Sequence, residues 1–406
     1  MIFAAASVIV VSRHRAGALQ RCLMALTQQD HPNFEVVVVA DPQGIATARA
    51  MGLTLRLATF DEANISAARN IGLSLSAGAI VAFIDDDAVA EPTWLKRLCA
   101  PFSDAFVVAA TGFVRGRNGI SWQWKAAEVD CFGQDHRFEV GDAGEVRAGT
   151  PERAVKTQGT NCAFRAESLR GIGGFDPAYR FFLDEADVNL RLAPLGPTAI
   201  VPLAEVHHGF AASTQRRADR VPLDLTEIAA STAVFLRRHA PQSDPAPHWA
   251  RLLAELTFRL QAHRRAGRLS ERQQKALLGG LETGWATGMT RELPPLPPLP
   301  AAASTFTRLP GTGPRKGRVV HGLRWRRKQL LDAARRASEA GQIVTVFCFS
   351  LTARAHRNQF HPEGFWLQEG GLFGRSERAA WWFRLFTCAA RTRHEARRIG
   401  RVRPLD

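Results

Sequence analysis

The sequence contains no run of about 18 consecutive apolar residues, so no membrane-spanning helix is expected. Its six cysteines are scattered without close pairs, which argues against a zinc site or a disulfide framework and is typical of the reducing cytosol. Residues 1–11 are apolar but lack a basic region and a small-residue cleavage site, so we interpret them as a core strand rather than a signal peptide. With 46% hydrophobic residues, the 406-residue chain is long enough for two or three globular domains.

The chain is strongly basic, with a formal net charge of +15. Such a charge attracts polyanions, among them nucleic acids, anionic lipids and phosphorylated ligands. The excess lies mainly in the second half, because basic residues outnumber acidic ones about three to one from Thr307 onward. No helix-turn-helix, zinc-finger or RNA-binding aromatic signature accompanies this charge, so no specific nucleic-acid partner is expected. A polyanion-binding protein is the alternative function that the charge alone supports.

The first half alternates strand and helix patterns, which predicts an α/β chain with an open mixed, mostly parallel sheet flanked by helices. Short apolar runs predict strands over residues 7–11, 34–40, 53–57, 79–84, 106–114, 159–165 and 199–206. Helical spacing predicts helices over residues 16–28, 66–76, 92–102 and 183–192, and another from Glu167. Residues 115–155 mix aromatic, polar and glycine residues, so we expect a loop-rich insert facing the substrate.

Three further parts follow the first domain, which we assign to residues 1–222. Helices predicted over residues 222–241, 247–266 and 270–283 form a helical extension, residues 223–290. The proline-rich segment 294–300 must be extended and stiff, so residues 291–315 are predicted to be a linker. A basic helical pattern over residues 319–341 and a buried strand over 343–349 predict a small basic α/β domain, residues 316–406.

Three carboxylates, Asp85, Asp86 and Asp87, directly follow a buried strand. Parallel sheets bind ligands just outside the carboxyl ends of their strands, so these acids lie where chemistry is expected. Side chains alternate along an extended chain, so Asp85 and Asp87 share a face while Asp86 points away. Two carboxylates together with phosphate oxygens would suit a hard divalent ion such as Mg2+ or Mn2+. A solvated turn after the strand is the alternative.

An ordered set of segments carries a family resemblance: Ser7–Arg15, Ile65–Gly72, Phe83–Asp87, Gly159–Asp176 and Leu183–Arg191. Together they resemble the family 2 glycosyltransferases, which have the GT-A nucleotide-sugar-binding fold, over about residues 5–210. The resemblance implies a metal-dependent, inverting, hexosyltransferase-like enzyme. It would move a sugar from a nucleoside diphosphate sugar to a glycan or glycolipid hydroxyl in surface polysaccharide synthesis, on the cytoplasmic side.

The resemblance also implies roles for residues around the donor. Asp87, with Asp85, would supply the metal and ribose contacts, and the metal would stabilise charge on the departing diphosphate. The other candidate donor-binding residues are Ser12, Arg13, Arg15, Asp41, Arg69 and Asp86. Arg69 either contacts phosphate or pairs with a core carboxylate. The family often has a second acid after the second strand, but here Asp41 stands alone, so the donor nucleotide stays open.

The catalytic base is expected on the segment Leu183–Arg191. Aligning the family pattern on Asp187 and Arg191 places Glu185 at the base position, with Asp184 and Asp187 as rivals. One of these acids is expected to act as a helix-start acid that interacts favourably with the helix dipole. A base opposite the leaving group implies a single displacement with inversion.

Other candidates have two interpretations each. His207 and His208 end a strand where relatives use a histidine near the diphosphate or metal, so either is a metal ligand or a structural residue. Trp122 and Trp124 form a stacking surface for an acceptor sugar, or they are packing anchors. Asn161, on the acceptor-side strand, is a third acceptor candidate.

Residues 316–406 resemble no family. Arginine and aromatic residues are interleaved, as in Trp381–Arg384, which suits an interface with anionic lipid headgroups and also a small folded domain with basic edges. We therefore expect salt-sensitive peripheral association with the inner face of a membrane through this part. A non-catalytic nucleotide-sugar-binding scaffold is the remaining alternative, and the acids at both the metal and the base positions argue against it.

Overall fold

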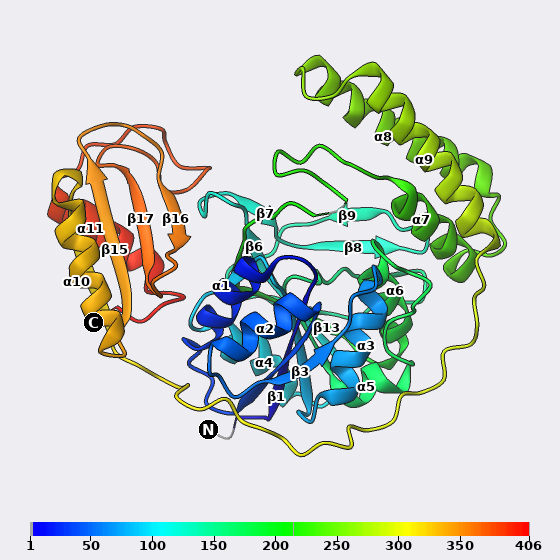
Figure 1. Ribbon diagram of the computed structural model, residues 1–406, viewed down its shortest axis with the longest axis horizontal. Coiled ribbons are helices and arrows are strands. Elements are labelled where there is room, and N and C mark those ends of the chain that lie inside the picture. The colour runs from blue at the N-terminus through cyan, green and yellow to red at the C-terminus, as the bar shows by residue number, and fades with distance from the viewer. Residues whose placement is uncertain (1–2, 214, 406) are drawn as a thin grey trace.

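The computed structural model describes residues 3–213 and 215–405 (Figure 1). The strands of the first half are β1 Ala6–Ser12, β2 Phe34–Ala40, β3 Arg56–Thr59, β4 Ile80–Asp85, β5 Ala88–Ala90, β6 Ala109–Arg115, β7 Trp122–Trp124, β8 Ala127–Asp130, β9 Asp135–Arg137, β10 Glu145–Arg147, β11 Arg153–Val155, β12 Cys162–Arg165 and β13 Thr198–His208. Its helices are α1 Ala16–Leu26, α2 Pro42–Ala50, α3 Ile65–Leu75, α4 Trp94–Cys99, α5 Ala166–Gly171 and α6 Asp184–Leu192.

A ten-stranded sheet forms the centre of this half, in the order β10-β13-β6-β12-β4-β1-β2-β3, with β5 paired to β13 and β7 to β6. The strands β3, β2, β1, β4, β6 and β13 share one direction, and β12 runs antiparallel between β4 and β6. This architecture confirms the predicted mixed, mostly parallel sheet. The carboxyl ends of β1, β2, β4 and β13 therefore meet at one edge.

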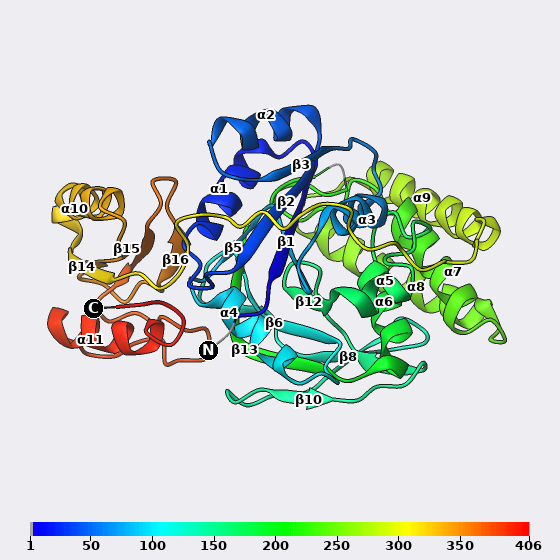
Figure 2. The same ribbon diagram turned by 90° about the horizontal axis from the view of Figure 1, so that it is seen from below.

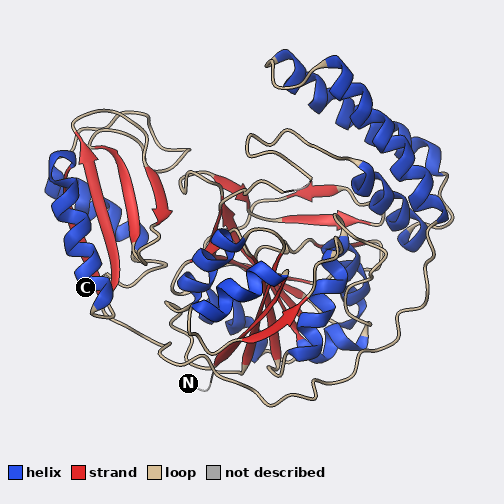
Figure 3. Ribbon diagram, viewed as in Figure 1, coloured by secondary structure: helices blue, strands red, loops and turns tan. Residues whose placement is uncertain are grey.

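Helices cover both faces of the sheet (Figure 3). Alternation along β1 explains this, because Val8 and Val10 enter one core cluster while Ile9 enters the other. Helices α1 and α4 pack in the first cluster, and α3, α5 and α6 in the second. The helix α2 was missed from the sequence, although Asp41 caps it and Pro42 begins it.

The insert, predicted to be loop-rich, also contains short strands. Strands β8, β9 and β11 pair antiparallel in a separate three-stranded sheet, and β7 and β10 extend the large one. Each of these five strands has only three or four residues, too few to show a clear alternation in the sequence.

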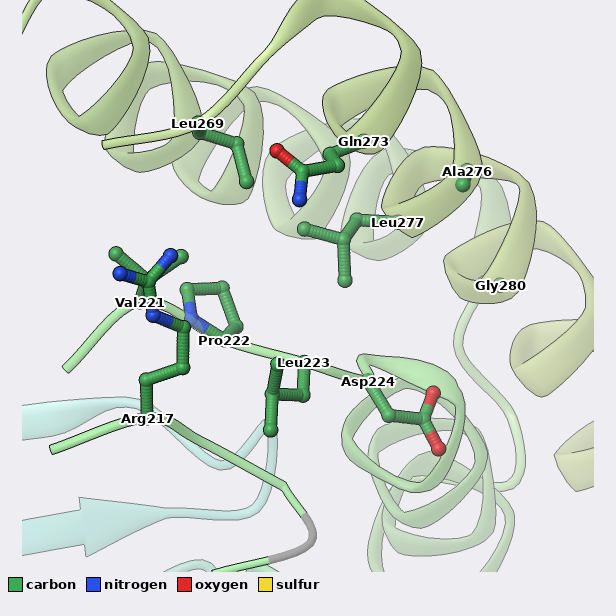
Figure 4. Close-up of a pocket in the computed structure, with 10 residues that line it drawn as sticks. All are labelled: Arg217, Val221, Pro222, Leu223, Asp224, Leu269, Gln273, Ala276, Leu277 and Gly280. Carbon is green, nitrogen blue, oxygen red and sulfur yellow. The ribbon is translucent and has the colours of Figure 1, made fainter. Parts of the chain in front are cut away.

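The helical extension consists of α7 Thr226–His239, α8 Pro245–Arg265 and α9 Glu271–Thr290. Two glycines of α9, Gly284 and Gly288, allow α7 and α9 to approach closely. A Cβ added at Gly284 would lie 2.0 Å from the Thr226 carbonyl oxygen, and one added at Gly288 would lie 2.3 Å from the Ala230 carbonyl oxygen, so no larger side chain fits at either position. The segment before α7 packs on α9 through apolar side chains, around a cavity of about 200 Å³ (Figure 4). Among the described residues, no helix is long and apolar enough to cross a membrane.

The proline-rich segment contains no helix or strand in its described residues and runs along the sheet from α9 to the C-terminal part (Figures 1 and 2). Backbone hydrogen bonds hold it there: Leu299 N donates to Arg170 O at 2.9 Å and Leu309 N to Phe34 O at 2.8 Å. Leu309 is buried in the first core cluster. The segment is therefore extended, as predicted, and bound to the first half.

The last part has a four-stranded sheet in the order β14-β15-β17-β16, with helices on its two faces. Its elements are β14 Gly317–Leu323, α10 Arg327–Glu339, β15 Ile343–Ser350, β16 Arg357–Phe360, β17 Trp366–Gly371 and α11 Cys388–Ile399. The helix predicted over residues 319–341 is wrong at its start. Parallel pairing with β15 makes residues 317–323 a strand, with Val319 and Val320 facing opposite clusters.

Candidate active site

Asp85, Asp87 and His208 lie together at the carboxyl edge of the sheet. One ligand atom from each lies within 4.8 Å of the others. Asp85 ends β4, and the short strand β5 begins just after Asp87. Because β5 pairs antiparallel with β13 and sets Ala88 opposite His208, the end of β13 reaches the aspartates.

The orientation of His208 fits a cation between these side chains. Its Nδ1 lies 2.9 Å from Gln123 Oε1, an acceptor, so Nδ1 carries a proton. Its Nε2 lies 3.1 Å from Asp87 Oδ1 and 3.9 Å from Asp85 Oδ2. A neutral imidazole would thus present a lone pair to two carboxylates, and such acceptors need a proton or a metal ion between them. The donor set fits Mn2+ or Mg2+.

Asp87 is held in its charged form. Burial opposes its ionisation, but a hydrogen bond and charge from His208 with a proton on Nε2, the Arg15 charge and a 2.6 Å hydrogen bond from Ala211 N outweigh burial and hold the pKa of Asp87 well below the usual value. An ionised carboxylate at neutral pH is the form that binds a metal ion.

Asp86 points away from this group, as the alternation of side chains predicts. Ser12 Oγ donates to its Oδ2 at 2.6 Å, and an Arg15 guanidinium nitrogen lies 2.6 Å from Oδ1. Burial raises the pKa of Asp86 to about 7 against the opposing charge of Arg15. Ser12 and Arg15, both candidate donor residues, therefore also fix the turn that carries Asp85 and Asp87.

Arg69, on α3, links the end of β4 to the start of α6. Its guanidinium pairs with Asp184, lies 3.2 Å from Glu185 Oε1, and lies 3.9 Å from Asp85 Oδ1. The side chain is buried, with an exposed fraction of 5%. Arg69 was expected either to contact phosphate or to pair with a core carboxylate, and in the structure it pairs with carboxylates.

Glu185 is the base candidate that faces the site. Its side chain is 21% exposed, and Arg69 outweighs burial to hold the pKa of Glu185 below the usual value. Asp184 is buried, and burial with the Glu185 charge raises its pKa well above the usual value. Asp187 is wrong as a rival base, because it is fully buried against Arg191 at 2.9 Å and His239 at 2.9 Å.

The backbone around Glu185 is tightly arranged. Phe182 and Leu183, just before α6, both have positive φ angles of 74° and 64°. Bulky residues adopt this conformation only where surrounding packing enforces it, and such strain clusters at functional sites.

Gly159 approaches the Glu185 and Arg69 side chains closely. A Cβ at Gly159 would lie 2.0 Å from Glu185 Oε1 and 2.1 Å from an Arg69 guanidinium nitrogen. Gly159 and Gln123 lie at the site but were not among the predicted site residues, although Gly159 begins a segment that carries the family resemblance; no local pattern marks Gln123.

Two predicted site residues are structural. Asn161 is fully buried: its Oδ1 accepts from Trp94 Nε1 at 2.8 Å, and its Nδ2 donates to the Phe113 and Ala204 carbonyls. It is therefore wrong as an acceptor residue. His207 lies 2.8 Å from Glu91 instead, so of the two histidines it is His208 that joins Asp85 and Asp87.

The tryptophans of β7 differ in their surroundings. Trp124 packs against the first core cluster, as a packing anchor does. Trp122 lines a cavity, while one face of its ring is covered by the Arg115 guanidinium at 3.9 Å. An acceptor contact stays a prediction for Trp122 alone.

Arg13 and Asp41 lie at the ends of β1 and β2. Arg13 pairs with Asp61 at 2.9 Å at the surface. Asp41 accepts hydrogen bonds from His14 N, Gln43 N and Gly44 N. These bonds outweigh burial and lower the pKa of Asp41. Contacts of either residue with a donor stay predictions.

Residues 4–220 match the family described as "Glycosyltransferase like family 2". The chain belongs to this glycosyltransferase family. The resemblance predicted from the ordered segments is thereby confirmed, and with it the α/β fold of GT-A type.

Two curated relatives come from Haloferax volcanii. A glucosyl-dolichyl phosphate glucuronosyltransferase is 30% identical over 115 residues, 28% of this chain and 34% of that protein. Glycosyltransferase AglE is 38% identical over 100 residues, 22% of this chain and 33% of that protein. The chain thus matches about a third of the length of each. A solved structure of S. aureus TarS 1–349 with UDP-GlcNAc has a TM-score of 0.45 and 16% identity, covering 70% of this chain and 81% of that one.

Proposed function

We propose that this glycosyltransferase moves a sugar from a nucleoside diphosphate sugar to an acceptor hydroxyl, with inversion. The observation that carries the proposal is that Arg69 contacts both Asp85 and Glu185. The Asp85, Asp87 and His208 group and the Glu185 carboxylate therefore lie beside each other, around one guanidinium. These residues would hold Mg2+ or Mn2+, whose charge offsets that of the diphosphate leaving group.

Glu185 would accept the proton of the acceptor hydroxyl. Arg69 keeps it ionised and, with Asp184, positions it next to Asp85. With this base on the side of the sugar opposite the leaving group, the reaction would be a single displacement without a covalent intermediate. Ser12, Arg13, Arg15 and Asp41 would line the donor side, at the ends of β1 and β2.

A Glu185→Gln variant tests this role. The amide cannot accept a proton, so release of nucleoside diphosphate in the presence of acceptor should fall about 100- to 10,000-fold, while donor binding persists. Glu167→Gln is the matched control, because Glu167 is exposed on α5. Full activity of Glu185→Gln, together with an inactive Asp184→Asn, would move the base to Asp184.

We also propose that the acceptor is a lipid-linked glycan or phosphate at an anionic membrane surface. One of the relatives carries dolichyl phosphate in its name. The C-terminal part exposes a group of large apolar side chains: Trp381 (84%), Trp382 (68%), Phe383 (44%) and Leu385 (76%). Arg375, Arg378 and Arg384 flank them. Aromatic side chains with arginines suit the lipid headgroup region.

Vesicle sedimentation tests the membrane contact. The double variant Trp381→Ser/Trp382→Ser should lose binding to anionic vesicles at low salt. Phe106→Ser is the matched control, since Phe106 is 78% exposed and lies in the first half, three residues before β6. Equal sedimentation of all three proteins would contradict the proposal.

A further inference from the structure

A cavity of about 630 Å³ lies between the first half and the C-terminal part. Arg117 lines it from the β6–β7 connection, Trp122 and Gln123 from β7, Phe210 and Arg220 from the segment after β13, and Arg357 from β16. Three separate segments thus each contribute an arginine to one cavity, which no local sequence pattern could reveal.

The arginines that line this cavity are exposed at its surface and have no acidic partner among the described residues. The guanidinium groups of Arg220, Arg216 and Arg117 lie 3.8, 5.7 and 6.0 Å from the centre of one ring, Phe210. Within the described ranges, neither these three nor Arg357 has a carboxylate within ion-pair distance. Burial and repulsion from Arg216 and Arg117 lower the pKa of Arg220. Such a cluster is stabilised by a bound anion.

The cavity adjoins the Asp85, Asp87 and His208 group at β13 and β6, on the side of the sheet away from β1 and β2. The Phe210 ring lies 4.5 Å from the His208 ring, and Gln123 bonds to the same imidazole. Ala211 N, next in the chain, donates to Asp87. An anion in this cavity would therefore lie beside the reaction centre and opposite the candidate donor residues.

The C-terminal part completes the wall of the cavity. Asn358 N donates to Asn118 O at 3.0 Å, and Arg378 N donates to Ile120 O at 2.9 Å. Gly119 allows this contact, because a Cβ there would lie 2.3 Å from the Asn358 carbonyl. The same docking carries Arg357 to the cavity.

We propose that this cavity binds the phosphate group of a phosphorylated acceptor, with Arg117, Arg220 and Arg357 as its ligands. The proposal rests on the transferase function proposed above and adds the chemical class of the acceptor. Guanidinium groups bind phosphate through paired, charge-assisted hydrogen bonds, which fix orientation as well as position. Arg117 is held ready by bonds from its side chain to the Gly209, Phe210 and Ala218 carbonyls.

Calorimetric titration of the full chain with octyl phosphate tests the proposal. Arg220→Gln and Arg357→Gln should each weaken binding about ten- to hundredfold, the loss expected for a charge-assisted hydrogen bond. Arg357 lies on a regular strand, so its variant remains informative if the Arg220 variant misfolds. Arg217→Gln is the matched control, because Arg217 is on the same segment but pairs with Asp219 at 3.0 Å. Arg357→Lys should restore part of the affinity.

Two further titrations separate the alternatives. Tighter binding of octyl phosphate than of inorganic phosphate supports a lipid-linked acceptor, and equal binding supports recognition of the phosphate alone. Equal affinity of wild type, Arg220→Gln and Arg357→Gln would overturn the proposal, as would competition between octyl phosphate and a nucleoside diphosphate with Mn2+. Binding of the nucleoside diphosphate with Mn2+, measured alone, reports on the transferase function independently.

Discussion

Replacing Arg403 with methionine should loosen the C-terminal part from the sheet. Arg403 is 1% exposed and donates to both Glu91 oxygens, at 2.9 and 2.7 Å. It also donates to Thr345 Oγ1 at 3.1 Å and lies 3.9 Å from the Trp366 ring centre. Methionine keeps much of the volume but leaves the Glu91 carboxylate buried with His207 alone.

Two arguments give the size of this effect. Arg403 and His207 overcome burial and lower the pKa of Glu91 from 4.5 to about 2, which corresponds to about 3 kcal/mol of stabilisation of its charged form. Removing one partner of a buried ion pair typically costs about 3–5 kcal/mol. We expect Arg403→Met to lower the free energy of unfolding by about 3 kcal/mol at pH 7.

Urea unfolding, followed by tryptophan fluorescence, measures this loss. Because the folded-state pKa of Glu91 is depressed, its stabilisation is complete above about pH 4.5 and disappears as pH falls through about 2. The difference between wild type and Arg403→Met should therefore shrink between pH 4.5 and 2. The double variant with Glu91→Gln should recover part of the loss. A difference below about 1 kcal/mol at pH 7 would refute the reasoning.

Three other predictions follow from the buried groups. Gly159→Ala should leave the chain folded but lower transfer about 100-fold, because the added Cβ displaces Glu185 and Arg69; unchanged turnover would contradict this. Burial lowers the pKa of His356 from 6.5 to about 4 in the folded chain. Between pH 7 and pH 5 this imidazole is therefore protonated in the unfolded chain but not in the folded one, and the free energy of unfolding should fall by about 2 kcal/mol. His356→Gln should flatten that slope in thermal or urea unfolding, and identical slopes would argue against the assignment. Asn161→Ala should cost about 3 kcal/mol in urea unfolding, because three buried groups lose their partner; a near-neutral result would count against its structural role.

The alternation of side chains along a strand was enough to predict which aspartates at the end of β4 share a face. It separated Asp85 and Asp87 from Asp86, and the apolar run before them located the carboxyl end of β4. The ordered segments indicated the family, because several motifs of one family follow one another along the chain in the family's order. These features depend only on nearby residues, which a sequence shows directly.

Side chains that depend on pairing between distant strands could not be placed in this way. The choice of His208 over His207 follows from the register of β5 on β13, and β5 has only three residues. Asn161 lies in a segment that resembles the family, yet its partners come from α4, β6 and β13. Likewise, β14 is a strand because it pairs with β15, whereas its basic sequence continued a helical pattern.

Metal-dependent binding of a nucleoside diphosphate tests the central claim most directly. Calorimetric titration with UDP, GDP and dTDP, each with Mn2+ or with a chelator, compares wild type with Asp87→Asn, His208→Ala and the control Glu167→Gln. We predict that wild type and the control bind one of these nucleotides only when Mn2+ is present, and that Asp87→Asn and His208→Ala lose this binding while staying folded. Equal binding by all four proteins, with and without the chelator, would contradict the account.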